Sequence, residues 1–287
     1  MRWIVAGALG MLGQDMSEIV EAAGHEVIRV DRAEMDITDP DQVTSTIVGT
    51  DVIVNCAAWT AVDAAETAEA QAFWINAVGA ATLARAAAEQ GARLVQVSTD
   101  YVFDGTATTP YAEDAPVRPQ SAYGRTKGAG EWAVAAARGD HLVVRTAWLY
   151  GANGPCFPAT VRKILRERGG IDVVDDQVGQ PTWTMDLARL ILDLVESRAP
   201  AGTYHGTSGG STSWYGFARE IARSCGFDPD LVRPTTSASF VRPAPRPAYS
   251  VLDHATVVGA GAKPIGDWLD RWHEAAPVVL PAHEISS

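Results

Sequence analysis

Short apolar runs alternate with longer amphipathic or alanine-rich segments through the first half of the chain. The apolar runs have the length and aliphatic composition of buried strands, and they occupy residues 3–6, 25–30, 51–56, 92–98 and 141–145. Apolar residues at helical spacing, or a high alanine content, predict helices at 11–23, 70–90 and 122–137. This alternation predicts an α/β fold, with a Rossmann-type, doubly wound parallel sheet covered on both faces.

The pattern changes after residue 150, where tryptophans and prolines appear among shorter elements. The spacing predicts helices at 161–168, 185–195 and 213–225, and strands at 171–174 and 203–205. A loop at 175–182 is rich in side-chain donors and acceptors, and Arg242 and Arg246 follow in a proline-rich segment, where each could bind a diphosphate or be solvated. We predict a Rossmann domain at 1–150 and a smaller α/β part at 151–287 that is interleaved with it.

Composition narrows the classes of partner. The formal net charge is −12 and the isoelectric point lies near 4.9. Such a balance argues against nucleic acid or an acidic membrane surface as a partner. An anionic small molecule stays compatible, because a helix N-terminus and a few arginines can hold phosphates locally.

The cysteines are Cys56, Cys156 and Cys225, an odd number at wide spacing, so we predict neither a disulfide framework nor a metal site. The apolar N-terminus is interrupted by glycines, and no apolar stretch has the length of a transmembrane helix. These features predict a cytoplasmic protein. The sequence leaves a monomer and a homodimer equally open.

A glycine-rich turn follows the first predicted strand and opens the first predicted helix; it reads Gly7-Ala8-Leu9-Gly10-Met11-Leu12-Gly13. Glycines permit a tight turn and the close approach of a pyrophosphate. The helix N-terminus adds free N–H groups and a partial positive charge. We interpret the turn as the phosphate cradle of a dinucleotide, against the alternative of an ordinary glycine turn.

Two further segments are expected beside that cradle. Asp31 ends the second strand 18 residues after Gly13, close to the ~20 typical of an acid that binds the ribose of NAD. Arg32 could instead receive the 2′-phosphate of NADP, so the preference between NADH and NADPH stays open. Ala57-Ala58-Trp59 follow the third strand, where small residues suit close packing against a nucleotide.

A tyrosine and a lysine stand four residues apart at the start of the 122–137 helix. Tyr123 and Lys127 therefore share one face of that helix. An ammonium beside a phenol lowers the pKa of the phenol, which then exchanges a proton with a carbonyl or alcohol near neutral pH. Thr99, at the end of the fourth strand, could hydrogen-bond to the same oxygen. The pair alone is a weak motif that an ordinary surface pair would also explain.

Several residues in the predicted helices are poor helix formers. Asn76 lies within the 70–90 segment, and we interpret it as a buried amide that ties neighbouring loops together. Gly124, Gly128 and Gly130 lie within the 122–137 helix. We interpret them as sites where the helix approaches a strand or the cofactor closely.

In combination these segments resemble the extended short-chain dehydrogenase/reductases and, within them, the dTDP-4-dehydrorhamnose reductase family. The resemblance covers nearly the whole chain. Its motifs are the glycine-rich turn together with Asn55-Cys56-Ala57-Ala58-Trp59-Thr60-Ala61-Val62-Asp63, Ser98-Thr99-Asp100-Tyr101-Val102-Phe103-Asp104-Gly105, Tyr123-Gly124-Arg125-Thr126-Lys127, Val144-Arg145-Thr146-Ala147-Trp148-Leu149-Tyr150-Gly151 and Asp176-Gln177-Val178-Gly179-Gln180-Pro181-Thr182.

The resemblance implies reduction by NADPH or NADH of the 4-keto group of a dTDP-4-keto-6-deoxy-L-sugar, foremost dTDP-4-dehydro-L-rhamnose to dTDP-L-rhamnose. It gives the catalytic positions to Thr99, Tyr123 and Lys127. It gives cofactor contacts to Gly10, Met11, Leu12, Asp36, Ile37, Ala57, Ala58 and Trp59. It makes residues 151–287 mainly a sugar-nucleotide-binding part, and gives substrate contacts to Thr99, Asp100, Trp148, Gln177 and Gln180.

Other functions on the same fold stay open. Related reductases of antibiotic deoxysugar pathways share these motifs, and a sugar-nucleotide epimerase, a 4,6-dehydratase or a non-enzymatic regulatory subunit would share the fold. Dehydratases of the extended short-chain dehydrogenase/reductase superfamily typically carry Thr-Asp-Glu, whereas here Tyr101 follows Asp100. The intact Thr99, Tyr123 and Lys127 weigh against a regulatory subunit. A requirement for Mg²⁺ is not indicated by the sequence.

Overall fold

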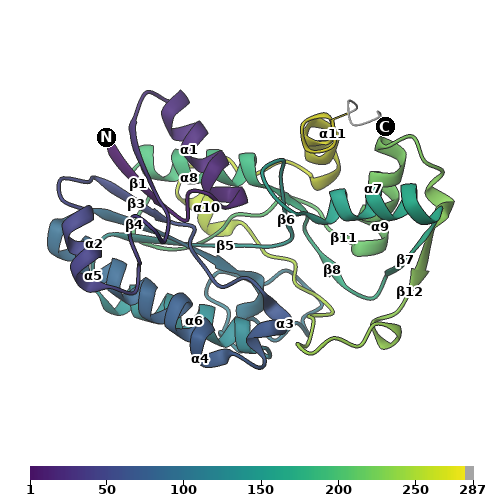
Figure 1. Cartoon of the computed structure of the whole chain (residues 1–287), viewed down its shortest axis with the longest axis horizontal. Coiled ribbons are helices and arrows are strands. Elements are labelled where there is room, and N and C mark those ends of the chain that lie inside the picture. The colour runs from purple at the N-terminus through teal and green to yellow at the C-terminus, as the bar shows by residue number, and fades with distance from the viewer. Residues whose placement is uncertain (282–287) are drawn as a thin grey trace.

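The computed structural model describes residues 1–281 of the chain, and its centre is a parallel β-sheet (Figure 1). Six strands pair in the order β10-β5-β4-β3-β1-β2. Their bounds are β1 Arg2–Ala6, β2 Glu26–Val30, β3 Val52–Asn55, β4 Arg93–Thr99, β5 His141–Thr146 and β10 Gly202–His205. Every neighbouring pair runs parallel. The predicted α/β fold with a parallel sheet is confirmed.

Helices cover both faces of this sheet (Figure 1). α1 (Met11–Ala22) and α8 (Thr184–Glu196) pack side by side on one face, with α10 (Ala255–Gly259) beyond them. α2 (Pro40–Thr46), α5 (Ala80–Gln90) and α6 (Ala122–Ala136) cover the other face. The inner strands β1 and β3 are buried on both sides, which explains why their sequences are apolar through most of their length rather than alternating, whereas the edge strand β2 is only partly buried.

The alanine-rich segment predicted as one helix is three elements. α4 (Glu69–Phe73) leads into a π-helical turn, η1 (Trp74–Gly79), and then into α5; the short α3 (Val62–Ala65) precedes them. Asn76 lies in the π-helical turn. Its amide accepts the Trp59 N–H at 2.8 Å and donates to the Trp59 carbonyl at 3.1 Å and to the Thr126 hydroxyl at 3.0 Å. The predicted tie between neighbouring segments is confirmed.

A second lobe is built on pairs of short strands (Figure 1). The pairs join β6 (Leu149–Tyr150) to β9 (Thr182–Trp183), β7 (Ile171–Val174) to β12 (Val232–Thr235), and β8 (Val178–Gly179) to β11 (Thr212–Ser213). α7 (Phe157–Arg168), α9 (Trp214–Ser224) and α11 (Trp268–Val279) pack around a core that includes Tyr150, Phe217 and Trp272. Short 3₁₀ turns complete the chain: η2 (Asp100–Val102), η3 (Pro229–Leu231) and η4 (Ser237–Ser239).

The chain crosses between the two lobes more than once. α8 and β10 come from the second half of the sequence, yet α8 covers the large sheet and β10 forms its edge. Within residues 1–281, no helix combines the length and the apolar character needed to cross a membrane.

Candidate functional site

Two clefts open where the strands of the large sheet end. We call the first the strand-end cleft; it has a volume of about 790 Å³ and lies beyond β1, β2 and β3. We call the second the inter-lobe cleft; it has a volume of about 810 Å³ and lies between the second lobe and the segments around α3 and η2. The carboxyl ends of parallel strands are where open α/β sheets bind their ligands.

The strand-end cleft gathers most of the predicted cofactor residues. Its lining includes Gly7, Gly10, Asp31, Arg32, Asp36, Ile37, Ala57, Ala58 and Trp59. Met11, Leu12 and Gly13 lie behind this lining, where Leu12 packs in the core under α1 and Met11 against the second lobe. Sequence reasoning missed Gln71, Trp74 and Ile75, which reach the cleft from α4 and η1.

The glycine-rich turn is shaped by backbone contacts that leave no space for side chains. Gly7 has a φ of +75°, and a Cβ there would overlap the backbone of Ala57. A Cβ on Gly13 would overlap the carbonyl oxygen of Gly7. The spacing of the glycines thus brings the turn against the loop after β3 and leaves the N-terminus of α1 open to the cleft.

Asp31 is fixed by the backbone of the same turn. Its carboxylate accepts the Leu9 N–H at 3.2 Å and the Arg32 N–H at 2.8 Å. Arg32 is 83% exposed and lies 3.5 Å from the carboxylate of Asp36. Hydrogen bonds from Thr38 hold the pKa of Asp36 below its usual range. Asp31, which favours NAD, and Arg32, which favours NADP, therefore both line the strand-end cleft.

Tyr123 lies between the two clefts. It packs against the same small apolar cluster, Ala65, Ala72 and Ala122, as Trp59, which lines the strand-end cleft. It also meets the ring of Tyr101 edge to face, with centroids 5.6 Å apart, and Tyr101 lines the inter-lobe cleft. Tyr123 is therefore a neighbour of lining residues of both clefts.

The three residues predicted to be catalytic gather at the end of β4. The Thr99 hydroxyl lies beside the Tyr123 phenol and favours its charged form. It also donates to Asp100 at 2.9 Å and accepts the Tyr101 N–H at 3.2 Å. The Lys127 ammonium donates to the Val97 carbonyl at 2.6 Å. These contacts draw the first turns of α6 against the strand end.

Burial dominates the titration of this group. It raises the pKa of Tyr123, the hydrogen bond with Thr99 lowers it in part, and the Asp100 carboxylate raises it further. This direction is the reverse of the one predicted from the Tyr–Lys pair. Burial lowers the pKa of Lys127 to about 8 and raises that of Asp100 to about 6.

The helical glycines let α6 approach other segments of the first lobe. A Cβ on Gly124 would overlap the Tyr101 carbonyl, and one on Gly130 would overlap the Asn76 carbonyl. A Cβ on Gly128 would lie 3.1 Å from the side chain of Val117. The prediction of close approach is correct, and the neighbours are η2, η1 and a loop rather than a strand.

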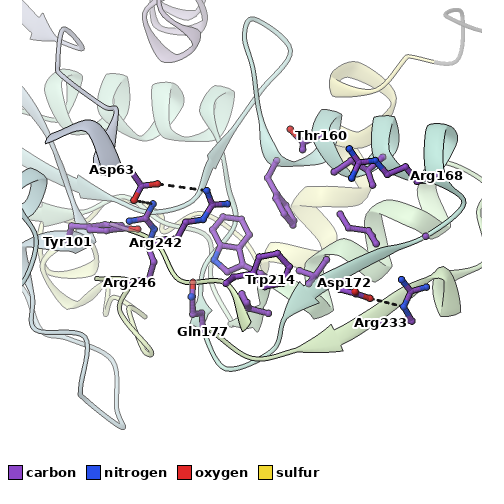
Figure 2. A pocket seen from close by; sticks show the side chains of 17 residues that line it. Asp63, Tyr101, Thr160, Arg168, Asp172, Gln177, Trp214, Arg233, Arg242 and Arg246 are labelled. Atoms are coloured by element: carbon purple, nitrogen blue, oxygen red, sulfur yellow. Dashed lines mark hydrogen bonds and ion pairs between the residues drawn. The ribbon is translucent and has the colours of Figure 1, made fainter. Parts of the chain in front are cut away.

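The inter-lobe cleft combines aromatic rings with arginines (Figure 2). Trp214 stacks on Trp148 with ring centroids 3.6 Å apart. Gln177 lines the cleft as a candidate contact. Gln180 does not; it is buried and bonds to Leu252 and Thr207, so its predicted contact with substrate is not supported by its position. Asp100 is likewise buried, beneath Thr99.

Four arginines line this cleft in a chain that is acidic overall: Arg168, Arg233, Arg242 and Arg246. Asp63 lies 2.9 Å from Arg246 and 4.0 Å from Arg242, and Asp172 lies 2.7 Å from Arg233 (Figure 2). The surplus of cations suits an anionic ligand. Among the residues that the structure describes, no three His, Cys, Asp or Glu side chains converge as metal ligands.

Comparisons with known proteins agree with this architecture. A family model described as the RmlD substrate binding domain matches residues 1–279. The chain is 46% identical over 285 residues to a dTDP-4-dehydrorhamnose reductase of Streptomyces griseus, covering 97% of this chain and 94% of that protein. It is 44% identical over 281 residues to a dTDP-4-keto-6-deoxy-D-glucose reductase of Streptomyces niveus, covering 97% of each.

A solved structure shares the whole fold. The dTDP-4-dehydrorhamnose reductase of Bacillus anthracis, in complex with NADP, superposes with a TM-score of 0.92 at 36% identity. The match covers 96% of this chain and 98% of that one.

Proposed function

The chain belongs to the dTDP-4-dehydrorhamnose reductase family, and we propose that it is an NAD(P)H-dependent oxidoreductase that reduces the 4-keto group of a dTDP-4-keto-6-deoxy sugar. The observation that carries the proposal is the position of Tyr123. It shares an apolar cluster with Trp59 of the strand-end cleft, and its ring meets that of Tyr101 in the inter-lobe cleft, which four arginines and Trp214 also line. A reductase needs a proton donor at such a junction, where two ligands meet.

Tyr123 donates its proton to the 4-keto oxygen as that oxygen gains negative charge. NAD(P)H, when bound, supplies the hydride for the carbonyl carbon. Thr99 hydrogen-bonds to the same oxygen and fixes its position. Lys127 carries the positive charge that stabilises the phenolate left on Tyr123, and it holds the nicotinamide ribose. The product is an alcohol at C4.

The sugar we favour is dTDP-4-dehydro-L-rhamnose, because it is the substrate that the family name specifies. A panel of dTDP-4-keto sugars tests this choice, with NAD(P)H absorbance as the rate signal and NMR as the assay of C4 configuration. Turnover of the rhamnose precursor to dTDP-L-rhamnose is the expected result. Faster turnover of a D-configured 4-keto sugar would instead support the type of activity named for the Streptomyces niveus relative.

We expect both NADH and NADPH to be used, because Asp31 and Arg32 line the same cleft. Asp31→Ala should weaken kcat/KM with NADH more than with NADPH, since it removes the acid that can bond to the ribose hydroxyls. Asp41→Ala, which removes an exposed acid in α2, is the control and should change neither. A wild-type preference for one cofactor beyond about a thousandfold (~4 kcal/mol) would contradict the expectation.

We expect dTDP to bind in the inter-lobe cleft. Hydrogen exchange with dTDP present should slow in peptides that contain Gln177, Arg233 and Arg242, because these residues line that cleft (Figure 2). NADP⁺ alone is the comparison and should slow exchange around the glycine-rich turn. Protection by dTDP that stays confined to residues before Tyr150 would show that the nucleotide binds elsewhere.

A further inference from the structure

A third polar residue continues the face of α6 that carries the tyrosine and the lysine. Tyr123, Lys127 and Glu131 follow one another at intervals of four residues, so they form one stripe. Lys127 is 4% exposed and Glu131 is 5% exposed. The lysine therefore lies between a phenol and a carboxylate, away from water.

Hydrogen bonds fix the Glu131 carboxylate from two strands. Arg145, on β5, donates to it twice, at 2.9 and 2.8 Å. Ser98, on β4 and adjacent to Thr99, donates to it at 2.5 Å. Arg145 is held in turn by the Glu113 carbonyl at 3.0 Å and by the face of the Phe103 ring, 4.9 Å from its central carbon. The carboxylate is thus immobile and fully bonded before any ligand arrives.

We propose that Glu131 is a positioning residue, whose buried carboxylate keeps the Lys127 ammonium charged and directed at the strand end, with Arg145 and Ser98 holding that carboxylate in place. The inference rests on the proposed function, because a charged Lys127 is what the reductase needs to hold the ribose and to stabilise the phenolate. A buried ammonium without a nearby anion loses its proton easily.

The groups around Lys127 leave Glu131 as its source of negative charge. Burial lowers the pKa of Lys127 to about 8, and the Glu131 carboxylate opposes that shift. Cys56, from the loop after β3, also faces the lysine, but its thiol has a pKa of about 12 and stays neutral. Tyr123 is neutral for the same reason. Removing the Glu131 charge must therefore lower the pKa of Lys127, so that the ammonium loses its proton at a lower pH than in the wild type.

On β5, the positive charge of Arg145 holds the Glu131 carboxylate. Arg145 is a cation, and His205 on β10 approaches it at 3.4 Å. Burial lowers the pKa of His205 to about 3, so this histidine is neutral and adds no second positive charge. Of this ion pair, Glu131 is the member that shares a face of α6 with Lys127, so the negative charge lies on the same helix face as the lysine.

The chain has three lysines, Lys127, Lys163 and Lys263, which allows a direct measurement. Protein labelled with ¹³C at lysine Cε gives three titration curves, and Lys127→Met identifies the one of interest. In the wild type its midpoint is expected near 8. In Glu131→Gln, which keeps the shape but removes the charge, the midpoint should fall by about one pH unit or more. The Kd for NADPH should rise with pH as Lys127 loses its charge, and in Glu131→Gln this rise should begin at a correspondingly lower pH.

Glu69→Gln is the matched control. Glu69 makes the same two-bond contact with an arginine of α6, Arg125, at 2.7 and 2.8 Å, but at the surface. Glu69→Gln should leave unchanged both the titration midpoint of Lys127 and the pH at which the Kd for NADPH begins to rise. The double variant Glu131→Gln/Arg145→Met guards against misfolding, because neither partner of the Glu131–Arg145 pair is then buried without the other. Its Lys127 midpoint should also lie below that of the wild type, but by less than in Glu131→Gln, because the Arg145 cation, which lowers the pKa of a nearby ammonium, is removed as well.

An unmoved Lys127 midpoint in both Glu131 variants would overturn the inference and leave the pair a purely structural contact. A uniform loss of NADPH affinity at every pH would do the same. Wild-type protein that binds neither NADPH nor NADH would overturn the proposed function itself, and the inference with it.

Discussion

Replacing Tyr123 with phenylalanine is expected to lower kcat by about 10²–10⁴, the usual effect of removing a positioned general acid. The ring contact with Tyr101 and the packing on the cluster of Ala65, Ala72 and Ala122 remain in the variant, so the packing between the clefts is kept. The Kd for NADPH should change little, because the phenol oxygen, rather than the ring, is what the reaction uses. Single-turnover kinetics with a dTDP-4-keto sugar measure the chemical step directly.

Tyr101→Phe is the control for this change. Tyr101 is the neighbouring phenol in the inter-lobe cleft, and burial raises its pKa as well. Thr99 contacts Tyr101 through the backbone N–H, which the variant keeps, whereas it lies beside the phenol of Tyr123. Tyr101→Phe should therefore cost far less in kcat. If Tyr123→Phe kept near wild-type kcat with chemistry rate-limiting, Asp100 would be the next candidate acid, since it is buried, bonded to Thr99 and has a pKa of about 6.

The pH profile separates the lysine from the tyrosine. Lys127 acts in its charged form, and its folded pKa of about 8 lies below the ordinary value, so its contribution is present below pH 8 and is lost above it. Burial places the pKa of Tyr123 higher still. The decrease of kcat/KM at alkaline pH is therefore expected to report the deprotonation of Lys127. Tyr123→Phe should lower kcat/KM at every pH without changing the pH at which this decrease occurs.

Local patterns were sufficient for the elements that form the large sheet and its first helix. The run before the glycine-rich turn is a strand because its residues are apolar on both faces, and α1 begins directly after Gly10, with Gly13 in its first turn. The α6 helix was predictable from its composition, and Ser121 caps it by accepting the Gly124 N–H. The pairing of Tyr123 with Lys127 followed from helical spacing alone.

The rest depended on contacts between distant segments. The break of residues 70–90 at a π-helical turn was hidden by alanines, which favour any helical state. Gln180 lay in a polar loop, and only the packed second lobe turns its amide toward Leu252. The pKa direction of Tyr123 was mispredicted because spacing reveals a neighbouring charge but not the depth of burial. Asp63 was not singled out, because its partners Arg242 and Arg246 lie about 180 residues away.

The largest expected effect on stability comes from Arg145→Met. The side chains of Arg145 and Glu131 are 5% and 6% exposed, so removing the arginine leaves a buried carboxylate without its hydrogen-bonded counterion. Breaking a buried pair in this way typically costs about 3–5 kcal/mol. The free energy of unfolding in urea, measured for the wild type and the variant at the same pH, is the quantity to compare.

Arg125→Met isolates the effect of burial in this comparison. Arg125 bonds to Glu69 through the same two nitrogens, but both side chains are 44% exposed. Losing an exposed pair should cost about 0–1 kcal/mol. Adding Glu131→Gln to Arg145→Met should recover part of the larger loss, because the unpaired charge is then gone. If Arg145→Met cost no more than Arg125→Met, the carboxylate would have to be protonated or hydrated in the variant, and the buried pair would not be what fastens α6 to β4 and β5.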